Sequence, residues 1–240
     1  MLFRENIVAI KDYISDLIFP KRCIVCGVYD TYLCDGCCSK IPINVRFSCP
    51  MCGQPSFYGH TCITCQPSSS LDGVWIVSEY HNEVLRACIH HFKYKGILDL
   101  QMNISGLYNK YFSQLSKDVL HVCQFDYIIP VPVHLRRRFE KGFNHSEILV
   151  DLVARCLHGV VLKAGIKKRR FTRPQVELDK AHRLINLFQA FAVADNVHWT
   201  GKKVLLVDDV MTTSSTLQEC AKVMKEAGAM KIWAIVLAHG

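Results

Sequence analysis

The stretch VLLVDDVMTTSSTL, residues 204–217, decides how the rest of the sequence is interpreted. Four apolar residues run into two adjacent aspartates, and a cluster of small hydroxyl residues follows. An apolar run of this kind is typical of a central parallel strand that is covered on both faces. Open α/β sheets bind ligands at the carboxyl ends of such strands. We therefore expect Asp208 and Asp209 at the mouth of a binding site.

The residues after the two acids form a candidate phosphate site. A strand-to-helix loop ends at a helix N-terminus, where free backbone N–H groups, hydroxyl donors and the helix dipole converge on an anion. We expect a ribose 5-phosphate here, with its hydroxyls on the two acids. The loop that would hold its phosphate consists of Met211, Thr212, Thr213, Ser214, Ser215 and Thr216.

Competing interpretations of the same stretch are weaker. The chain contains no G-x-x-x-x-G-K-[ST] loop and no G-x-G-x-x-G motif, which argues against a P-loop ATPase and against a dinucleotide site. The remaining alternative is a turn that the acids merely cap, but capping requires one acid and no row of hydroxyl residues.

The segments around this stretch alternate between strand and helix patterns. Residues rich in β-branched and aromatic side chains predict strands, and apolar residues at helical spacing predict helices. Strands are expected over 73–80, 126–133, 204–207 and 232–238, and helices over 84–92, 144–157 and 216–227. This alternation favours an α/β fold with a mainly parallel sheet and flanking helices.

Thirteen cysteines occur in the chain, and eight of them form four C-x-x-C pairs. Two residues between ligands let a tight knuckle direct both sulfurs at one tetrahedral ion, so two knuckles complete one zinc site. A redox motif is the alternative, but no thioredoxin-like pattern surrounds the pairs. We predict two zinc ions, held by Cys23, Cys26, Cys34, Cys37, Cys49, Cys52, Cys62 and Cys65.

The pairing of these knuckles is left open by the sequence. The repeats CIVCG and CPMCG suggest one zinc-ribbon unit present twice. Pairing in chain order would join the first two knuckles at one ion and the last two at the other, and crossed pairing is the alternative. Cys38 and His60 lie close enough to replace a neighbouring ligand. The remaining cysteines, such as Cys88 and Cys220, are expected in the core.

Composition and segmentation complete the outline. The polar segment 66–70 divides the chain into an N-terminal helix over 1–20, a double zinc ribbon over 21–66 and an α/β domain over 71–240. The first helix is expected to pack on the next module, with a membrane-surface helix as the alternative. Apolar runs are too short for membrane insertion, and charges interrupt any signal peptide, so we expect a cytoplasmic protein.

The charge of the chain is only mildly basic once zinc is considered. The formal net charge is +8. Eight thiolates and two Zn²⁺ ions would change it by −8 and +4, which leaves +4. This bias does not by itself indicate nucleic-acid binding.

The stretch at 204–216 resembles the phosphoribosyl pyrophosphate (PRPP) motif of type I phosphoribosyltransferases. The similarity is closer still to the competence protein F (ComF) family and covers nearly the whole chain. An N-terminal helix, the cysteine module, FKYKG, IIPVPVHLRRRFEKGFNHSE, RRFTRPQVELDKAHRLINLFQAF and the PRPP motif follow in that family's order. The resemblance implies a type I phosphoribosyltransferase-like domain behind a zinc-ribbon domain.

The resemblance also implies further site residues. A pyrophosphate loop would comprise Val131, Pro132, Val133, His134, Arg136, Arg137, Arg138 and Lys141. A mobile segment that closes over the substrate would contain Arg173, Gln175 and Arg183. Mg²⁺ would assist by bridging the oxygens of pyrophosphate and ribose.

Three positions depart from the family pattern. Ser214 stands where the phosphate loop usually has glycine, which permits unusual backbone angles. Lys141 replaces a common arginine and loses its bidentate fork. His145 replaces a glutamine.

The family's role implies the handling of incoming single-stranded DNA in natural transformation, beside a helicase partner. We therefore expect a PRPP-binding phosphoribosyltransferase of unspecified acceptor base. The alternatives are a non-catalytic PRPP or nucleotide sensor and a single-stranded-DNA-binding adaptor. A DNA-binding groove would interleave basic and aromatic residues, as around Tyr94, Phe139, Phe143 and Phe171. The sequence does not specify the oligomeric state.

Overall fold

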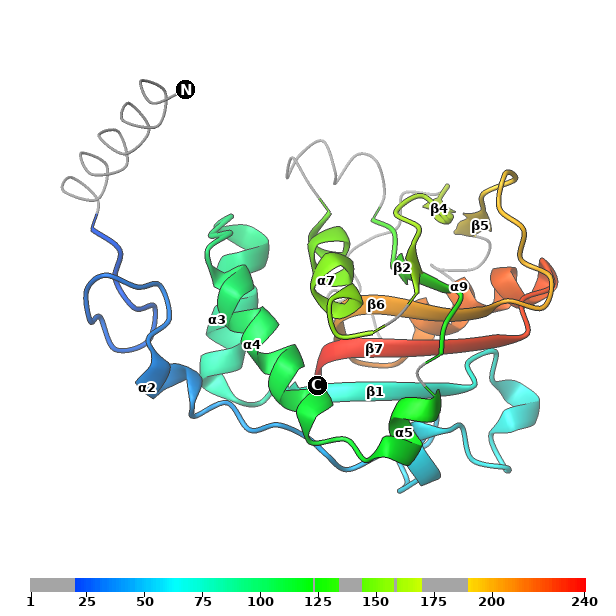
Figure 1. The fold of residues 1–240 in the computed structure, drawn as a ribbon, viewed down its shortest axis with the longest axis horizontal. Helices are drawn as coiled ribbons and strands as arrows, with labels where there is room; N and C mark the ends of the chain where they lie inside the picture. Colours follow the sequence, from blue (N-terminus) through cyan, green and yellow to red (C-terminus); the bar gives the residue numbers. More distant parts are fainter. Residues whose placement is uncertain (1–19, 123, 134–143, 158, 170–189) are drawn as a thin grey trace.

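The computed structural model describes residues 20–122, 124–133, 144–157, 159–169 and 190–240 (Figure 1). The segment 1–19, expected to contain the N-terminal helix, lies outside these residues. In chain order the elements of the ribbon region and the first half of the sheet domain are α2 (Asp35–Cys38), η1 (Phe57–Gly59), η2 (Gln66–Ser68), β1 (Gly73–Glu79), α3 (Glu83–Tyr94), α4 (Leu100–Ser113), α5 (Lys117–Val122) and β2 (Tyr127–Pro130). The elements that follow are α7 (His145–Ala154), β3 (Val160–Val161), β4 (Ile166–Lys168), β5 (Phe191–Val193), β6 (Lys203–Met211), α9 (Ser215–Glu226) and β7 (Lys231–His239).

The centre of the fold is a five-stranded sheet with the order β1-β7-β6-β2-β3. Every neighbouring pair in it is parallel, which confirms the expected parallel α/β fold. The strand β6 lies between β7 and β2, and its residues 204–207 are completely buried. An apolar run is needed there because side chains on both faces of a central parallel strand are covered.

Two hydrophobic layers cover the sheet. The helices α3, α4 and α7 pack on one face, where Leu205 and Val207 contribute from β6. The helix α9 and the antiparallel pair β4-β5 cover the other face, where Val204 and Leu206 contribute. The alternation of side chains along β6 therefore supplies both layers.

The first cysteine segment packs beside the helical layer of the sheet domain (Figure 1). Leu33, Cys37 and Ile41 are buried in the same core cluster as α3 and α4. The Asn103 Nδ2 donates to the Leu33 carbonyl at 3.0 Å, and the Ser78 hydroxyl donates to the Pro42 carbonyl at 2.6 Å. The ribbon and the sheet domain thus share one core.

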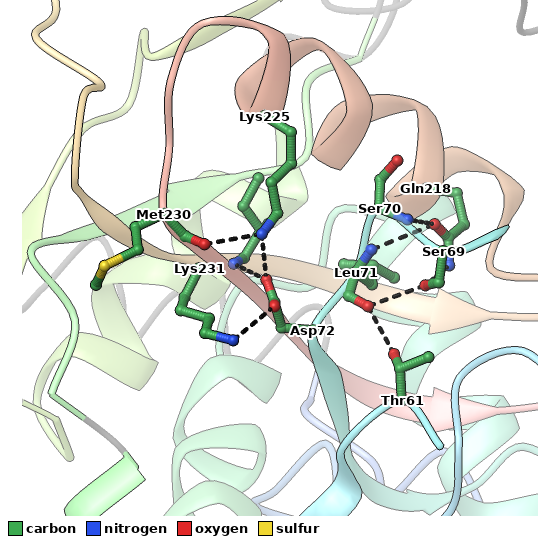
Figure 2. Close-up of polar contacts among 10 residues, drawn as sticks. Thr61, Ser69, Ser70, Leu71, Asp72, Gln218, Lys225, Met230 and Lys231 are labelled. Atoms are coloured by element: carbon green, nitrogen blue, oxygen red, sulfur yellow. Dashed lines mark hydrogen bonds and ion pairs between the residues drawn. The ribbon is translucent and has the colours of Figure 1, made fainter. Parts of the chain in front are cut away.

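The segment expected as a linker carries its own hydrogen bonds. Residues Gln66–Ser68 form a single 3-10 turn, and Asp72 follows directly before β1. The Asp72 carboxylate accepts from the Ile232 amide at 2.7 Å and pairs with Lys225 at 2.7 Å and Lys231 at 3.2 Å, as Figure 2 shows. These contacts fix the entry to β1 against β7 and the end of α9.

No helix among the described residues is both long and apolar enough to cross a membrane.

Gly73 is needed at the start of β1 because a Cβ there would lie 2.5 Å from the ring of Trp233. We expect Gly73→Ala to lower the free energy of unfolding by about 1–3 kcal/mol, as overpacking does. Gly106→Ala is the control, because its Cβ meets nothing within 4 Å and alanine favours the helix α4 by roughly 0.5–1 kcal/mol. Urea denaturation measures both, and equal stability of the two variants would contradict the prediction.

Candidate functional site: two cysteine clusters and an acidic strand end

The eight paired cysteines form two compact groups. Cys23, Cys26, Cys34 and Cys37 make one group, and Cys49, Cys52, Cys62 and Cys65 make the other, with all ligand atoms of a group within 4.8 Å of one another. Pairing in chain order is therefore correct, and Cys38 and His60 belong to neither group. Four sulfurs at this separation fit a tetrahedral zinc ion, so the chain has two zinc sites, each made of four cysteines.

The same knuckle geometry appears in both ribbons. Gly27 and Gly53 follow the second cysteine of each knuckle and have φ angles of 78° and 72°, in the left-handed region that glycine favours. The amide of Gly27 donates to the Cys23 carbonyl at 2.9 Å, and that of Gly53 donates to the Cys49 carbonyl at 3.0 Å. The sequence repeat thus corresponds to a structural repeat.

The electrostatics of each group also favour a bound cation. Burial opposes ionisation of Cys23 and Cys49, yet backbone N–H groups of the knuckles lower the pKa of both thiols to about 6. Burial and neighbouring thiols raise the pKa of Cys37 to about 12, and neighbouring thiols followed by burial do the same for Cys65. Four thiols cannot all ionise at such distances without a positive ion, and zinc requires thiolates.

The two aspartates lie within β6 and are held by different helices. The strand continues through both acids to Met211, so it is longer than the apolar run predicts. The Asp209 Oδ1 accepts from Lys93 Nζ at 2.7 Å, and the Asp208 Oδ1 accepts from Ser146 Oγ at 3.2 Å. Lys93 comes from the last turn of α3 and Ser146 from the first turn of α7, so three elements meet at the acids.

Lys93 and Ser146 contact the two acids but are not among the site residues predicted from the sequence. Lys93 follows the buried Ile89 by four residues and therefore continues the apolar face of α3. A lysine in that position needs an acidic partner, and this signal was present in the sequence. Ser146 carries no comparable signal, because a serine near a helix start is ordinarily a capping residue.

The acid pair has an unusual charge state. Burial and the neighbouring Asp209 raise the pKa of the Asp208 carboxyl from 3.8 to about 7. Burial lowers the pKa of Lys93, but the two carboxylates outweigh this effect and raise it overall. Asp209 is thus the partner of a protonated lysine, and Asp208 takes up a proton near neutral pH.

The expected phosphate loop turns sharply into α9. Ser214 has a φ angle of 47° and a ψ angle of −4°, which is the left-handed conformation, and its side chain makes no capping hydrogen bond. The hydroxyls of Thr213 and Ser215 lie 2.8 Å apart. A pocket of about 580 Å³ opens beside residues 211–215 and is lined also by α9, by residues 48–51 of the second ribbon and by Ser68 and Ser70.

The pyrophosphate loop is described only at its start. The amide of the buried Val131 donates to the Val207 carbonyl at 2.9 Å, while Pro132 is half-buried and Val133 exposed. His145 is buried, with its ring edge against Phe92 at 5.3 Å between centroids. The remaining predicted residues of this loop and of the mobile segment lie outside the described residues: His134, Arg136, Arg137, Arg138, Lys141, Arg173, Gln175 and Arg183.

Comparisons with known proteins agree with both halves of this arrangement. The double zinc ribbon domain family matches residues 14–66, and the phosphoribosyl transferase domain family matches residues 149–240. With the parallel sheet, these matches confirm the phosphoribosyltransferase-like α/β fold behind a zinc-ribbon region.

Curated relatives match over most of the chain. DNA utilization protein YhgH of Escherichia coli O157:H7 is 30% identical over 208 residues, which cover 82% of this chain and 87% of that protein. Competence protein F of Haemophilus influenzae is 29% identical over 233 residues, with 92% and 98% covered. Competence protein ComFC of Bacillus subtilis is 24% identical over 205 residues, with 83% and 80% covered.

Among solved structures, glutamine PRPP amidotransferase from Bacillus subtilis matches with a TM-score of 0.38 and 18% identity over 58% of this chain. The chain spans about a quarter of the length of the solved structures that it matches, 27% in this case.

The raised pKa of Asp208 predicts a pH-dependent gain for Asp208→Asn. The folded chain keeps a proton that the unfolded chain releases, so stability falls as the pH rises from about 4 to about 7. Asparagine avoids this loss, and we expect its stability gain to be about 2 kcal/mol larger at pH 8 than at pH 5.5. Denaturation at both values without added Mg²⁺ measures it, with the exposed Asp195→Asn as control. A gain independent of pH contradicts the prediction.

The left-handed conformation of Ser214 predicts opposite effects of two substitutions. Ser214→Gly removes the Cβ that the conformation disfavours, and we expect an increase of up to about 1 kcal/mol in the free energy of unfolding. Ser214→Val should decrease it by more than about 1 kcal/mol, because branched residues tolerate this region poorly. Urea denaturation of both variants tests the prediction, which fails if valine is as stable as glycine.

Proposed function

Since the chain belongs to the competence protein F family, we propose that it is a phosphoribosyltransferase-fold protein of DNA uptake that binds PRPP in the cytoplasm. The acids Asp208 and Asp209 receive the ribose hydroxyls, and the loop 211–216 receives the 5-phosphate. The names of the relatives support the role in DNA uptake. Two clusters of thiols support a reducing compartment.

The proposal depends on one observation, which is that two acids and a hydroxyl-rich turn occur together near the end of β6. Two carboxylates at the end of a buried strand are followed by a hydroxyl-rich turn that opens a helix of twelve residues. Carboxylates accept from sugar hydroxyls, and the amides at a helix N-terminus bind phosphate. Because the acids and the turn are separated by only a few residues, the arrangement supports a site for a single phosphorylated pentose.

The neighbouring side chains prepare the acids for this ligand. Lys93 pairs with Asp209 at 2.7 Å, while Ser146 and the Asp209 amide, which donates at 2.9 Å, orient the Asp208 oxygen. One lysine beside two acids does not balance their charge when both are ionised, so the site can accept a further positive charge. Oxygen ligands of this kind fit Mg²⁺, which when bound supplies charge neutralisation for the pyrophosphate group.

The reaction that this site would support is phosphoribosyl transfer to a nitrogen base. The bond between C1 of the ribose and the pyrophosphate oxygen breaks, and its electron pair leaves with pyrophosphate. A ring nitrogen of the acceptor forms the new bond to C1 and releases its proton to solvent. The protein's part is to bind and orient the pentose and to stabilise the separating charges.

Binding without turnover is a second candidate. Among the described residues, the Asp209 Oδ1 already accepts from Lys93 Nζ and from the Val210 amide. PRPP would have to compete with the existing Asp209–Lys93 ion pair. An aspartate engaged in this way suits a protein that binds PRPP as a signal without turning it over. Single-turnover release of pyrophosphate, measured with a panel of nucleobases, distinguishes the two functions.

The proposal predicts Mg²⁺-dependent PRPP binding that requires both acids. We expect the double variant Asp208→Asn/Asp209→Asn to weaken binding at least about tenfold, because charge-assisted hydrogen bonds to the ligand are lost. Titration calorimetry with and without Mg²⁺ measures this, after circular dichroism confirms folding. Glu226→Gln, at the exposed end of α9, is the control. Wild-type protein that binds no PRPP refutes the proposed function.

A further inference from the structure

The pocket beside the phosphate loop has a wall that comes from the second zinc ribbon. Pro50 and Met51, which stand between the ligands Cys49 and Cys52, line the pocket together with Thr212 and Thr213. Among the described residues that line it, none belongs to the first ribbon. The two zinc sites therefore differ in their relation to the phosphate loop, although their sequences and knuckles repeat.

Gln218 connects this wall to α9. Its side-chain Oε1 accepts from the Ser70 amide at 2.8 Å and from the Leu71 amide at 3.3 Å. Its Nε2 donates to the Ser69 hydroxyl at 2.9 Å and to the Met51 sulfur at 3.0 Å. Figure 2 shows Gln218 reaching from the helix to the segment before β1 that carries Ser69, Ser70 and Leu71.

The backbone of the same residue contacts the turn that would bind phosphate. The Gln218 amide donates to the Ser214 carbonyl at 2.8 Å, which is the first hydrogen bond of α9 after the left-handed turn. Gln218 thus contacts the zinc knuckle through its side chain and the proposed phosphate-binding turn through its backbone, and so connects the two. A displacement of the knuckle would remove the sulfur contact and loosen the first turn of the helix.

The position of Met51 in turn depends on the metal site. Between the two halves of the second cysteine group, the described contacts are the Cys62 amide to Cys49 Sγ at 3.4 Å and the approach of Cys52 Sγ to Cys62 Sγ at 3.8 Å. Sulfur contacts of this kind are weak, so a bound zinc ion would be the main link between the two halves of the group. The first ribbon instead packs on α4, through Leu33 and Asn103.

We propose that the zinc site of the second ribbon is energetically coupled, through Met51 and Gln218, to the phosphate-binding turn at Ser214. Zinc loading at Cys49, Cys52, Cys62 and Cys65 then sets the affinity for a phosphorylated ligand, and Gln218 is the positioning residue that transmits the effect. The identity of the ligand, PRPP, rests on the proposed function.

Coupling of this kind is reciprocal. If zinc at the second site strengthens PRPP binding, PRPP must strengthen zinc retention at that site by the same factor. We therefore expect PRPP to slow the release of one of the two zinc ions to a chromogenic chelator. A ribbon that only stabilises the fold would not give this selective protection.

The test compares matched variants of the full chain. Cys52→Ser and Cys26→Ser alter equivalent exposed ligands of the two ribbons. We expect Cys52→Ser to weaken PRPP binding about tenfold, and at least about fivefold more than Cys26→Ser does, as typical coupling energies allow. Gln218→Met should retain both zinc ions but lose the protection by PRPP, with Glu226→Met on the same helix as control.

Amide hydrogen exchange of residues 215–218 separates failure of this inference from failure of the proposed function. Coupling predicts faster exchange there in Cys52→Ser than in Cys26→Ser, whether or not PRPP binds. If wild-type protein binds no PRPP but this difference appears, the proposed function fails and the coupling stands. Equal exchange in the two variants, or zinc protection that persists in Gln218→Met, overturns the coupling. Should Cys52→Ser not fold, Gln218→Met with both zinc ions decides the question.

Discussion

Two adjacent carboxylates in a buried strand impose the main constraint on this structure. Asp209 is only 6% exposed, and Asp208 beside it has a pKa near 7 because burial and its neighbour disfavour a second negative charge. One lysine, Lys93, compensates part of this charge from α3. The burial of two adjacent carboxylates costs folding free energy, and a fold seldom retains such a cost unless the site has a function. The unusual charge state is therefore an argument for a ligand that is rich in hydroxyl groups or accompanied by a cation. The helices α3 and α7 stabilise this charge state through the contacts of Lys93 and Ser146 with the two acids.

The cysteine ribbons belong to the same argument and are more than an appended module. The first shares its core with α3 and α4, and α3 carries the lysine of the acid pair. The second lines the pocket and contacts α9 through Gln218. Small segments with few apolar residues depend on metal for their folding energy. Both ribbons consequently contact the sheet domain, the first through the helical core and the second through the pocket and Gln218.

The sequence predicted those features that depend on local pattern. The apolar run into Asp208 and Asp209 predicted the central strand, and the repeated knuckles predicted two zinc-ribbon units. The pairing of the knuckles was left open by the sequence and is given by the structure. Ser214 was marked by its departure from glycine, and the structure places it at a positive φ angle. The helix α4 was not predicted, although Leu100, Ile104 and Tyr111 follow helical spacing, so this omission was avoidable. The contacts of Gln218 and Ser146 with distant segments could not be predicted, because sequence spacing carries no information on which surfaces meet.

The position of β1 in the sheet has a consequence for biosynthesis. This strand lies at one edge of the described sheet, where its neighbouring strand is β7, with Gly73 opposite Trp233. β7 is translated long after β1. While the chain emerges from the ribosome, the apolar side chains and backbone groups of β1 therefore remain unpaired until β7 is available. The zinc ribbons can fold earlier, because the ligands of each site lie close together in sequence. Nascent chains should therefore be able to acquire metal before the sheet closes.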